Sequence, residues 1–213
     1  AIGSFVQNGN ALTGTFITKT GDYRYLAGEV NGNKLSLSCF DGAHAFLFTA
    51  DISEDDSTLK NGKFYSGKHW EQNWSAVKND KISPENPYTL TKLINNETTL
   101  HFKFPNRKGD SISIQDDAYN NKVVIVQVMG SWCPNCMDES AYLAKLHEKY
   151  KDKGLEIIAV AFEANADALT INKRISRVID RFGIGYEVLI GGNSTDKKAT
   201  SAAFPEVNQI ISY

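Results

Sequence analysis

Residues 123–136 of the chain read VVIVQVMGSWCPNC, and this stretch decides the fold. The run Lys122–Val128 is almost wholly apolar, which is typical of a strand covered on both faces of a sheet. Two cysteines with two residues between them follow the strand, and a helical pattern begins at Pro134. The stretch therefore predicts a pair of thiols where a helix starts, at the carboxyl edge of a sheet, where α/β folds place their chemistry.

Strand and helix patterns alternate after this stretch. The helix Pro134–Lys151 repeats apolar residues three and four positions apart, and Gly154 stands where a C-terminal cap is expected. The other expected elements are the strand Leu155–Phe162, a helix with apolar residues at Ile171, Ile175, Val178 and Phe182, the strand Glu187–Ile190, and the helix Thr195–Ala203. This order predicts an α/β domain with a mostly parallel sheet and helices on both of its faces.

The first 80 residues follow a different pattern, rich in Thr, Tyr, Phe and Val between turns that contain Gly and Asn. Six strands are expected, at Leu12–Thr20, Tyr23–Val30, Lys34–Phe40, His44–Ala50, Leu59–Tyr65 and Trp70–Val77. Strands of this length and spacing predict a small antiparallel sandwich or barrel. Residues 1–80 are therefore expected to form an N-terminal all-β domain.

Residues 81–98 lack a sustained period and hold Pro84 and Pro87, as a linker does. The α/β domain then covers residues 99–213, and it opens with a hairpin made by Thr99–Phe104 and Ser111–Gln115. The chain stops on the apolar run 210–213, whereas the ends of natural chains are more often polar. We therefore expect that the α/β domain is truncated at its C-terminus.

Composition excludes several classes of protein. Hydrophobic residues make up 41% of the 213 residues, which is enough for packed cores and excludes a disordered chain. Lys and Arg number 23 against 25 Asp and Glu, so the net charge of −2 gives no basic surface for a nucleic acid. The apolar runs are far shorter than the roughly 20 residues of a membrane-spanning helix. Three cysteines are too few for a small domain held together by disulfides.

The cysteine pair has the chemistry of a redox couple. Unpaired N–H groups and the positive end of the helix dipole favour a thiolate at the start of a helix. A thiolate attacks a disulfide, and a second thiol resolves the mixed disulfide. We assign Cys133 as the nucleophile and Cys136 as the resolving thiol. Because Pro134 has no N–H, the N–H groups of Asn135 and Cys136 are left to point at the sulfur, and we expect Cys133 to be more acidic than a free cysteine.

Two other uses of the pair stay open. A zinc site needs about two further ligands in a matching cluster, and Cys39 with the four histidines offers no second clustered pair. Inert packing of two buried cysteines is the other alternative. The order strand, Trp, Cys-x-x-Cys and helix favours redox chemistry over both.

The segment from Val123 to Cys136, followed by Met137-Asp138-Glu139 and a βαβ pattern, resembles the thioredoxin superfamily. More narrowly, it is similar to the extracytoplasmic thiol–disulfide oxidoreductases of the TlpA/ResA type, which overlap in sequence with the AhpC/TSA group. The resemblance covers residues 99–213, and the preceding β domain resembles an arrangement found in Bacteroidetes members.

This resemblance implies a thioredoxin fold without a metal or other cofactor. It also implies a protein disulfide as substrate, an upstream thiol as electron donor, and a place outside the cytoplasm, in the periplasm or anchored to a membrane through a removed N-terminal segment. Trp132 is implied to shield the disulfide and to contact the substrate.

Three departures from the family matter. Thioredoxins commonly keep an Asp six residues before the first Cys as a proton acceptor, and Gln127, which cannot ionise, stands there. Glu163, after the second buried strand, is the nearest candidate to replace it, and an ordinary loop carboxylate is the alternative. Asn135 stands where the family usually has Pro before the second Cys. The family's cis-Pro loop, hairpin and final helix would all follow Tyr213, which agrees with a truncation.

We therefore interpret the chain as a thiol–disulfide oxidoreductase, most simply a reductase. A peroxidase of the AhpC/TSA type has Pro seven residues and Thr or Ser three residues before its cysteine, and neither Cys133 nor Cys136 has them. A binding or assembly module with secondary redox chemistry is the alternative from another class. The motif does not define the direction of electron flow, because proteins with related motifs span about 150 mV in reduction potential.

Overall fold

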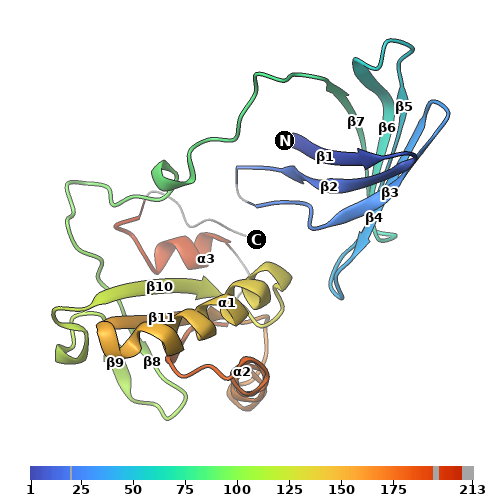
Figure 1. Ribbon diagram of the computed structural model, residues 1–213. Helices are drawn as coiled ribbons and strands as arrows, with labels where there is room; N and C mark the ends of the chain where they lie inside the picture. The colour runs from blue at the N-terminus through green and yellow to red at the C-terminus, as the bar shows by residue number, and fades with distance from the viewer. Residues whose placement is uncertain (20, 194–196, 208–213) are drawn as a thin grey trace. The chain divides into compact units, whose positions relative to one another are not determined.

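A computed structural model describes residues 1–19, 21–193 and 197–207 of the chain (Figure 1). It contains two compact units, of which the first comprises Ala1–Pro87 and the second begins at Tyr88. The division falls inside the segment 81–98 that we expect to be a linker. An antiparallel bridge between Leu93 and Val207 joins part of this segment to the second unit.

The first unit is a single antiparallel sheet in which each strand pairs with the next one along the chain. Its strands are β1 (Ile2–Asn8), β2 (Ala11–Ile17), β3 (Leu26–Asn31), β4 (Lys34–Phe40), β5 (Ala45–Ile52), β6 (Thr58–Ser66) and β7 (Trp70–Val77). The sheet curls around an aromatic core, since the ring of Phe16 on β2 lies 5.4 Å from the ring of Trp74 on β7. Phe48 packs beside them, 4.9 Å from Phe16 and 4.5 Å from Phe64.

Two expectations for this unit need correction. The seven strands form one curled sheet, so a sandwich of two packed sheets is wrong. Strand β1 is present although no strand is expected there, and five of its seven residues are exposed. A strand that buries so little apolar surface has no clear alternation in its sequence. The other six strands lie at or close to their expected positions.

The second unit has a three-stranded sheet at its centre. Its strands are β10 (Val123–Met129), β11 (Leu155–Phe162) and β12 (Glu187–Gly192), and β11 pairs in parallel with both of the others. The longer helices are α1 (Pro134–Tyr150), α2 (Ala168–Phe182) and α3 (Lys197–Ala202), and the strands β8 (Lys103–Pro105) and β9 (Ser111–Ser113) form a hairpin. Single 3₁₀ turns lie at Pro87–Thr89, Asp117–Tyr119 and Lys151–Lys153.

Separate apolar layers cover the two faces of this sheet. On one face, Ile157, Ala159 and Ala161 of β11 pack against residues of α1 and α2. On the other face, Ile158 and Val160 pack with Phe102, Phe204 and the β8–β9 hairpin. Every residue from Ile157 to Phe162 is at most 2% exposed, which explains why this strand is a continuous apolar run in the sequence.

Both long helices have defined ends. Asp167 is the N-cap of α2, because its carboxylate accepts the Thr170 N–H at 2.9 Å. Gly183, with a φ of 63°, ends α2 in the left-handed conformation that favours glycine. Helix α1 ends at Tyr150, one residue before the expected end, and the turn Lys151–Lys153 closes at Gly154.

The structure describes only part of the elements expected near the C-terminus. Helix α3 covers most of the expected helix Thr195–Ala203, of which residues 195 and 196 lie outside the described residues. The run 210–213, on which the expectation of truncation rests, also lies outside them. Among the described helices, none is both long enough and apolar enough to cross a membrane.

The packing of α2 on the sheet predicts that substitutions at two residues of this helix change stability by very different amounts. Ile175 is fully buried in the layer under α1 and α2, whereas Leu169 is 64% exposed. Replacing Ile175 with Ala should lower the free energy of unfolding by about 2–5 kcal/mol, because it leaves a cavity. The matched control Leu169→Ala should change it by less than about 0.5 kcal/mol.

Denaturant unfolding followed by helical circular dichroism measures both values, since the long helices belong to the second unit. Equal losses for the two variants would contradict the described packing.

Candidate functional site

The two cysteines lie where β10 ends and α1 begins. Cys133 is the N-cap residue of α1, with φ −97° and ψ 114°, and Pro134 occupies the first helical position. The Cys133 sulfur accepts a hydrogen bond from the Cys136 backbone N–H at 3.2 Å. This N–H is one of the groups at a helix start that have no partner within the helix. The sulfur therefore takes the place of the hydroxyl or carboxylate oxygen that usually caps a helix.

Both cysteines are buried, and the pair is in the dithiol form. Cys133 is 1% exposed and Cys136 is 3% exposed, and neither takes part in a disulfide. A hydrogen bond to the Cys133 side chain, together with burial and the nearby charge of Cys133, raises the pKa of the Cys136 thiol far above its usual value. Cys136 therefore stays protonated at neutral pH.

Gln127 lies under the start of α1 and is 3% exposed. Its amide nitrogen donates to a carboxylate oxygen of Glu139 at 3.0 Å and to the hydroxyl of Ser140 at 3.2 Å. These bonds connect strand β10 to the first turns of α1. Because an amide does not ionise, Gln127 holds the helix in place without supplying a proton acceptor.

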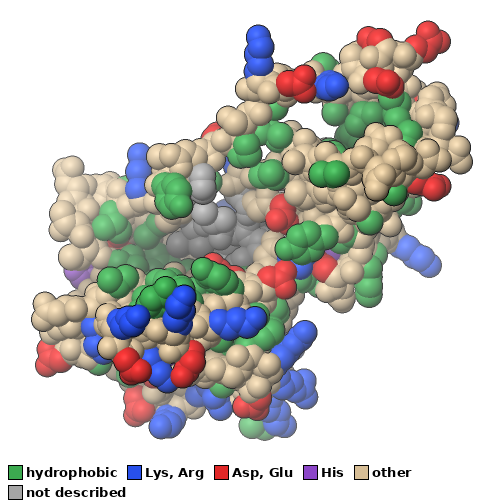
Figure 2. Space-filling view, viewed as in Figure 1, with side chains coloured by type: hydrophobic (Ala, Val, Ile, Leu, Met, Phe, Trp, Pro, Cys, Tyr) green, Lys and Arg blue, Asp and Glu red, His purple; other side chains and the backbone are tan. Residues whose placement is uncertain are grey.

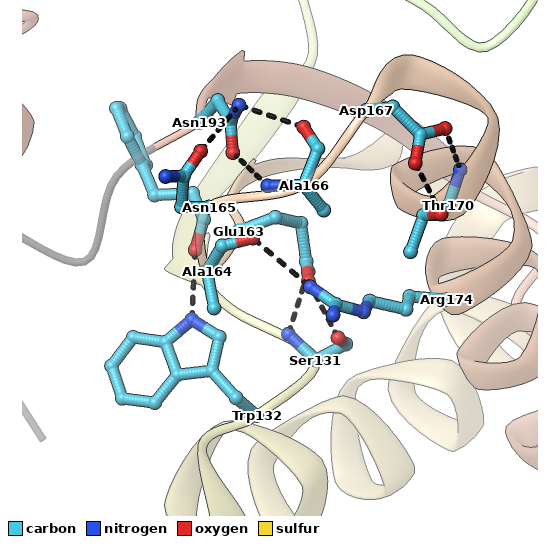
Figure 3. Close-up of polar contacts among 11 residues, drawn as sticks. Ser131, Trp132, Glu163, Ala164, Asn165, Ala166, Asp167, Thr170, Arg174 and Asn193 are labelled. Carbon is cyan, nitrogen blue, oxygen red and sulfur yellow. Dashed lines mark hydrogen bonds and ion pairs between the residues drawn. The ribbon is translucent and has the colours of Figure 1, made fainter.

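Glu163 is fully buried directly after β11, and it binds the loop that carries the cysteines. One carboxylate oxygen accepts the Ser131 backbone N–H at 2.8 Å, and the other accepts the Ser131 hydroxyl at 2.6 Å. Arg174 of α2 lies 4.0 Å from the same carboxylate (Figure 3). In the part of the chain that the structure describes, no hydrogen bond joins Glu163 to Cys136. Glu163 therefore lies beside the loop and binds Ser131, which stands two positions before Cys133.

Trp132 is held by a bond of its own to the same strand end. Its indole N–H donates to the Phe162 carbonyl at 3.0 Å. Gly130 makes room for this arrangement, because a Cβ at that position would lie 2.3 Å from the indole nitrogen. The side chain is partly buried and packs against the layer that contains both cysteines. Trp132 therefore lies beside the two cysteines, with its ring fixed by a hydrogen bond and by packing.

The loop that follows β11 is also fixed. Asn193, after β12, accepts the Ala166 N–H at 2.8 Å and donates to the Ala166 carbonyl at 2.7 Å (Figure 3). Arg174 donates to the Ala164 carbonyl at 3.0 Å. A groove of about 440 Å³ opens between this loop, the loop before Cys133 and helix α2. The site therefore combines a held pair of thiols with an open surface beside it.

Ser131 and Arg174 are the residues of the site that the sequence alone does not single out. The parallel register aligns Met129 with Ala161, so two residues further on Ser131 lies opposite Glu163. This register is the signal that predicts the pair, and it requires knowledge of how β10 and β11 align. Among the described residues, no group of three or more His, Cys, Asp or Glu side chains is arranged to hold a metal ion.

Comparison with known proteins gives a family match over the second unit. The family model described as Redoxin matches residues 94–209, more than half of the chain. This match confirms the resemblance to the thioredoxin superfamily that residues 123–136 carry.

Curated relatives share the same part of the chain. The thiol-disulfide oxidoreductase ResA of Halalkalibacterium halodurans is 33% identical over 94 residues, which are 44% of this chain and 49% of that protein. A ResA of Bacillus cereus is 37% identical over 114 residues, 52% of this chain and 64% of that protein. The chain thus spans about half the length of the curated relatives it matches.

Solved structures are similar over a comparable length. A thiol-disulfide oxidoreductase from Bacteroides fragilis is 19% identical with a TM-score of 0.39, and the match covers 48% of this chain and 72% of that one. The thioredoxin domain of a thiol-disulfide oxidoreductase from Bacteroides vulgatus is 21% identical with a TM-score of 0.38, and the match covers 48% of this chain and 67% of that one.

Because the Glu163 carboxylate is buried, we expect the free energy of unfolding to fall when its charge is removed. Replacing Glu163 with Gln keeps the shape but weakens the charge-assisted bonds to Ser131, so the free energy of unfolding should fall by about 1.5–3 kcal/mol. The matched control Glu148→Gln alters a carboxylate of α1 that is 74% exposed and pairs with Lys151 on the surface, and it should have little effect. Denaturant unfolding of the three proteins checks this, and an unchanged stability of Glu163→Gln would contradict the role described for the carboxylate.

Proposed function

The chain belongs to the Redoxin family, and we propose that it is an enzyme that reduces disulfides in proteins through the Cys133–Cys136 couple. The observation that carries this proposal is the position of the Cys133 sulfur, which caps α1 and accepts the Cys136 N–H at 3.2 Å. The curated relatives named thiol-disulfide oxidoreductase ResA support the same reaction.

Cys133 is the nucleophile in this proposal. The start of α1 presents an N–H and the positive end of the helix dipole to its sulfur, and both stabilise a thiolate. Pro134 has no N–H at a position where that group would lack a partner within the helix. Cys136 remains a neutral thiol, because its pKa is raised by the neighbouring Cys133 and by burial. The two chemically identical side chains thus take different roles.

Two exchange steps complete the reaction. The Cys133 thiolate attacks one sulfur of the substrate disulfide, so a mixed disulfide forms and the other substrate sulfur leaves as a thiolate. That thiolate takes the proton of Cys136, whose pKa is no longer raised by a charge on Cys133. The Cys136 thiolate then attacks the Cys133 sulfur and releases the second substrate sulfur. The substrate gains two electrons, and the enzyme is left with a Cys133–Cys136 disulfide.

This route needs no separate base beside Cys136. Both oxygens of Glu163 already accept hydrogen bonds from Ser131, so we assign Glu163 as a positioning residue that holds the loop before Cys133. Gln127 holds the start of α1 through Glu139. Trp132, fixed against Phe162, is the surface that meets the substrate.

Access to the sulfur sets a condition on the reaction. Because Cys133 is 1% exposed, a substrate sulfur reaches it only when neighbouring side chains move aside. Trp132 and Met137 are the partly buried residues of this loop and helix start that pack against the layer containing the cysteines. We propose that substrate binding displaces one or both of these side chains.

Turnover also needs a source of electrons. The oxidised couple returns to the dithiol only through an upstream thiol donor, and we propose that both this donor and the substrate are proteins. The resemblance to the TlpA/ResA type supports a reaction that takes place outside the cytoplasm.

Cysteine variants test the assignment of roles. In a Cys39→Ser background, Cys133→Ser should abolish reduction of a protein disulfide such as insulin, because no nucleophile remains. Cys136→Ser should instead accumulate a mixed disulfide through Cys133, because nothing resolves it. Cys39→Ser alone should keep full activity, since Cys39 lies on β4 in the first unit.

Mass spectrometry after alkylation detects the mixed disulfide. Turnover retained by Cys133→Ser, or trapping through Cys136 in place of Cys133, would contradict the proposal.

A further inference from the structure

The groove beside the redox pair has two unlike walls. Trp132 and Met137 give one wall apolar side chains, next to Cys133 and Cys136 in the chain. Three arginines of α2 form the other wall, namely Arg174, Arg177 and Arg181. The groove holds about 440 Å³, enough for a few side chains of a bound peptide. It therefore offers both apolar contact and positive charge near the thiols.

The three arginines share a face of α2 because they are spaced three and four residues apart. Arg174 is already engaged by the Ala164 carbonyl and lies near the buried Glu163. Arg177 and Arg181 are exposed, and the guanidinium of Arg181 lies over the ring of Phe182, 5.1 Å from its centroid. None of the described residues that line the groove is acidic. Two exposed cations thus line the groove.

This positive charge is local. The chain as a whole carries a net charge of −2, so the arginines do not reflect a generally basic protein. Figure 2 shows Lys and Arg side chains in the lower part of the view, where α1 and α2 lie in Figure 1, with Asp and Glu side chains among them. An ordinary solvent-exposed helix face does not require a groove next to it. These arginines, in contrast, line a groove that Trp132 also lines.

We propose that the groove binds an acidic segment of the substrate protein, next to the cysteine that Cys133 attacks. The proposal rests on the disulfide-reducing function proposed above and adds a class of substrate to it. Guanidinium groups bind carboxylates through two parallel hydrogen bonds, and the apolar wall takes the side chains between them. A segment bound there has its cysteine held close to the start of α1. Charge near the site raises the rate of encounter as well as the affinity.

Three disulfide-containing peptides of equal length test the idea. They differ only in the residues that flank the cysteine, which are Glu, Ser or Lys. The reduced chain should react with the Glu peptide about tenfold faster than with the Lys peptide at low salt, because two cations face the bound segment. The difference should shrink as salt is added, since salt screens exposed charges.

Two double variants of equal charge separate the groove from the whole molecule. Arg177→Glu/Arg181→Glu should reverse the preference and favour the Lys peptide. Lys103→Glu/Lys108→Glu removes the same charge at exposed positions outside the groove, on β8 and in the turn that follows it, and should keep the preference for the Glu peptide. Circular dichroism and denaturant unfolding that match the wild-type chain show that each variant is folded.

Each outcome has a defined meaning. Equal rates for the three peptides with the wild-type chain, or an equal change of preference in both double variants, would overturn the groove proposal while leaving disulfide reduction intact. Failure of the wild-type chain to reduce any of the three peptides would instead overturn the proposed function. A preference for a small anionic disulfide over the Glu peptide would also overturn the claim that the groove binds a peptide segment.

Discussion

The hydrogen bond from the Cys136 N–H to the Cys133 sulfur is the interaction on which the proposed chemistry depends. It exists because a parallel strand, β10, ends one loop before a helix begins, so that an N–H group of the first turn of α1 points at the side chain of Cys133. The arrangement makes the two thiols unequal. In the proposed mechanism the helix stabilises the Cys133 sulfur as an anion, whereas the pKa of Cys136 is raised by that neighbouring sulfur and by burial.

Side-chain hydrogen bonds hold the loop between β10 and α1 in place. Glu163 accepts two bonds from Ser131, Trp132 donates to Phe162, and Gln127 connects β10 to α1. Three of the groups involved, the carboxylate, the indole and the amide, are partly or fully withdrawn from water, so leaving them unpaired would be costly. The bonds therefore keep the sulfur at the start of the helix, and the groove beside Trp132 remains the open side of the site.

Local patterns in the sequence predict most of the elements but not how they meet. Buried strands such as Leu155–Phe162 are continuous apolar runs, and the N-cap position of Cys133 follows from Pro134, so these features are accessible from the sequence. The pairing of Ser131 with Glu163 is not, because it depends on the parallel register of β10 and β11.

Other features of the fold are set by long-range packing. Strand β1 buries too little to leave an alternating pattern, and the curl of a single sheet rather than two layers depends on contacts such as Phe16 with Trp74. The apolar stripe of α2 is evident from its spacing, but the groove beside its arginines exists only once the helix lies next to Trp132.

We propose that the start of α1 keeps Cys133 as a thiolate at a pH where a free cysteine is protonated. The decisive measurement is thiolate absorbance against pH, on reduced protein with Cys39→Ser. We expect a first titration below the value of about 8.5 that is usual for a free cysteine, lost in Cys133→Ser, and a second one far above it for Cys136. A first titration at or above that value would show that the helix does not activate the sulfur, and the proposed mechanism would be wrong.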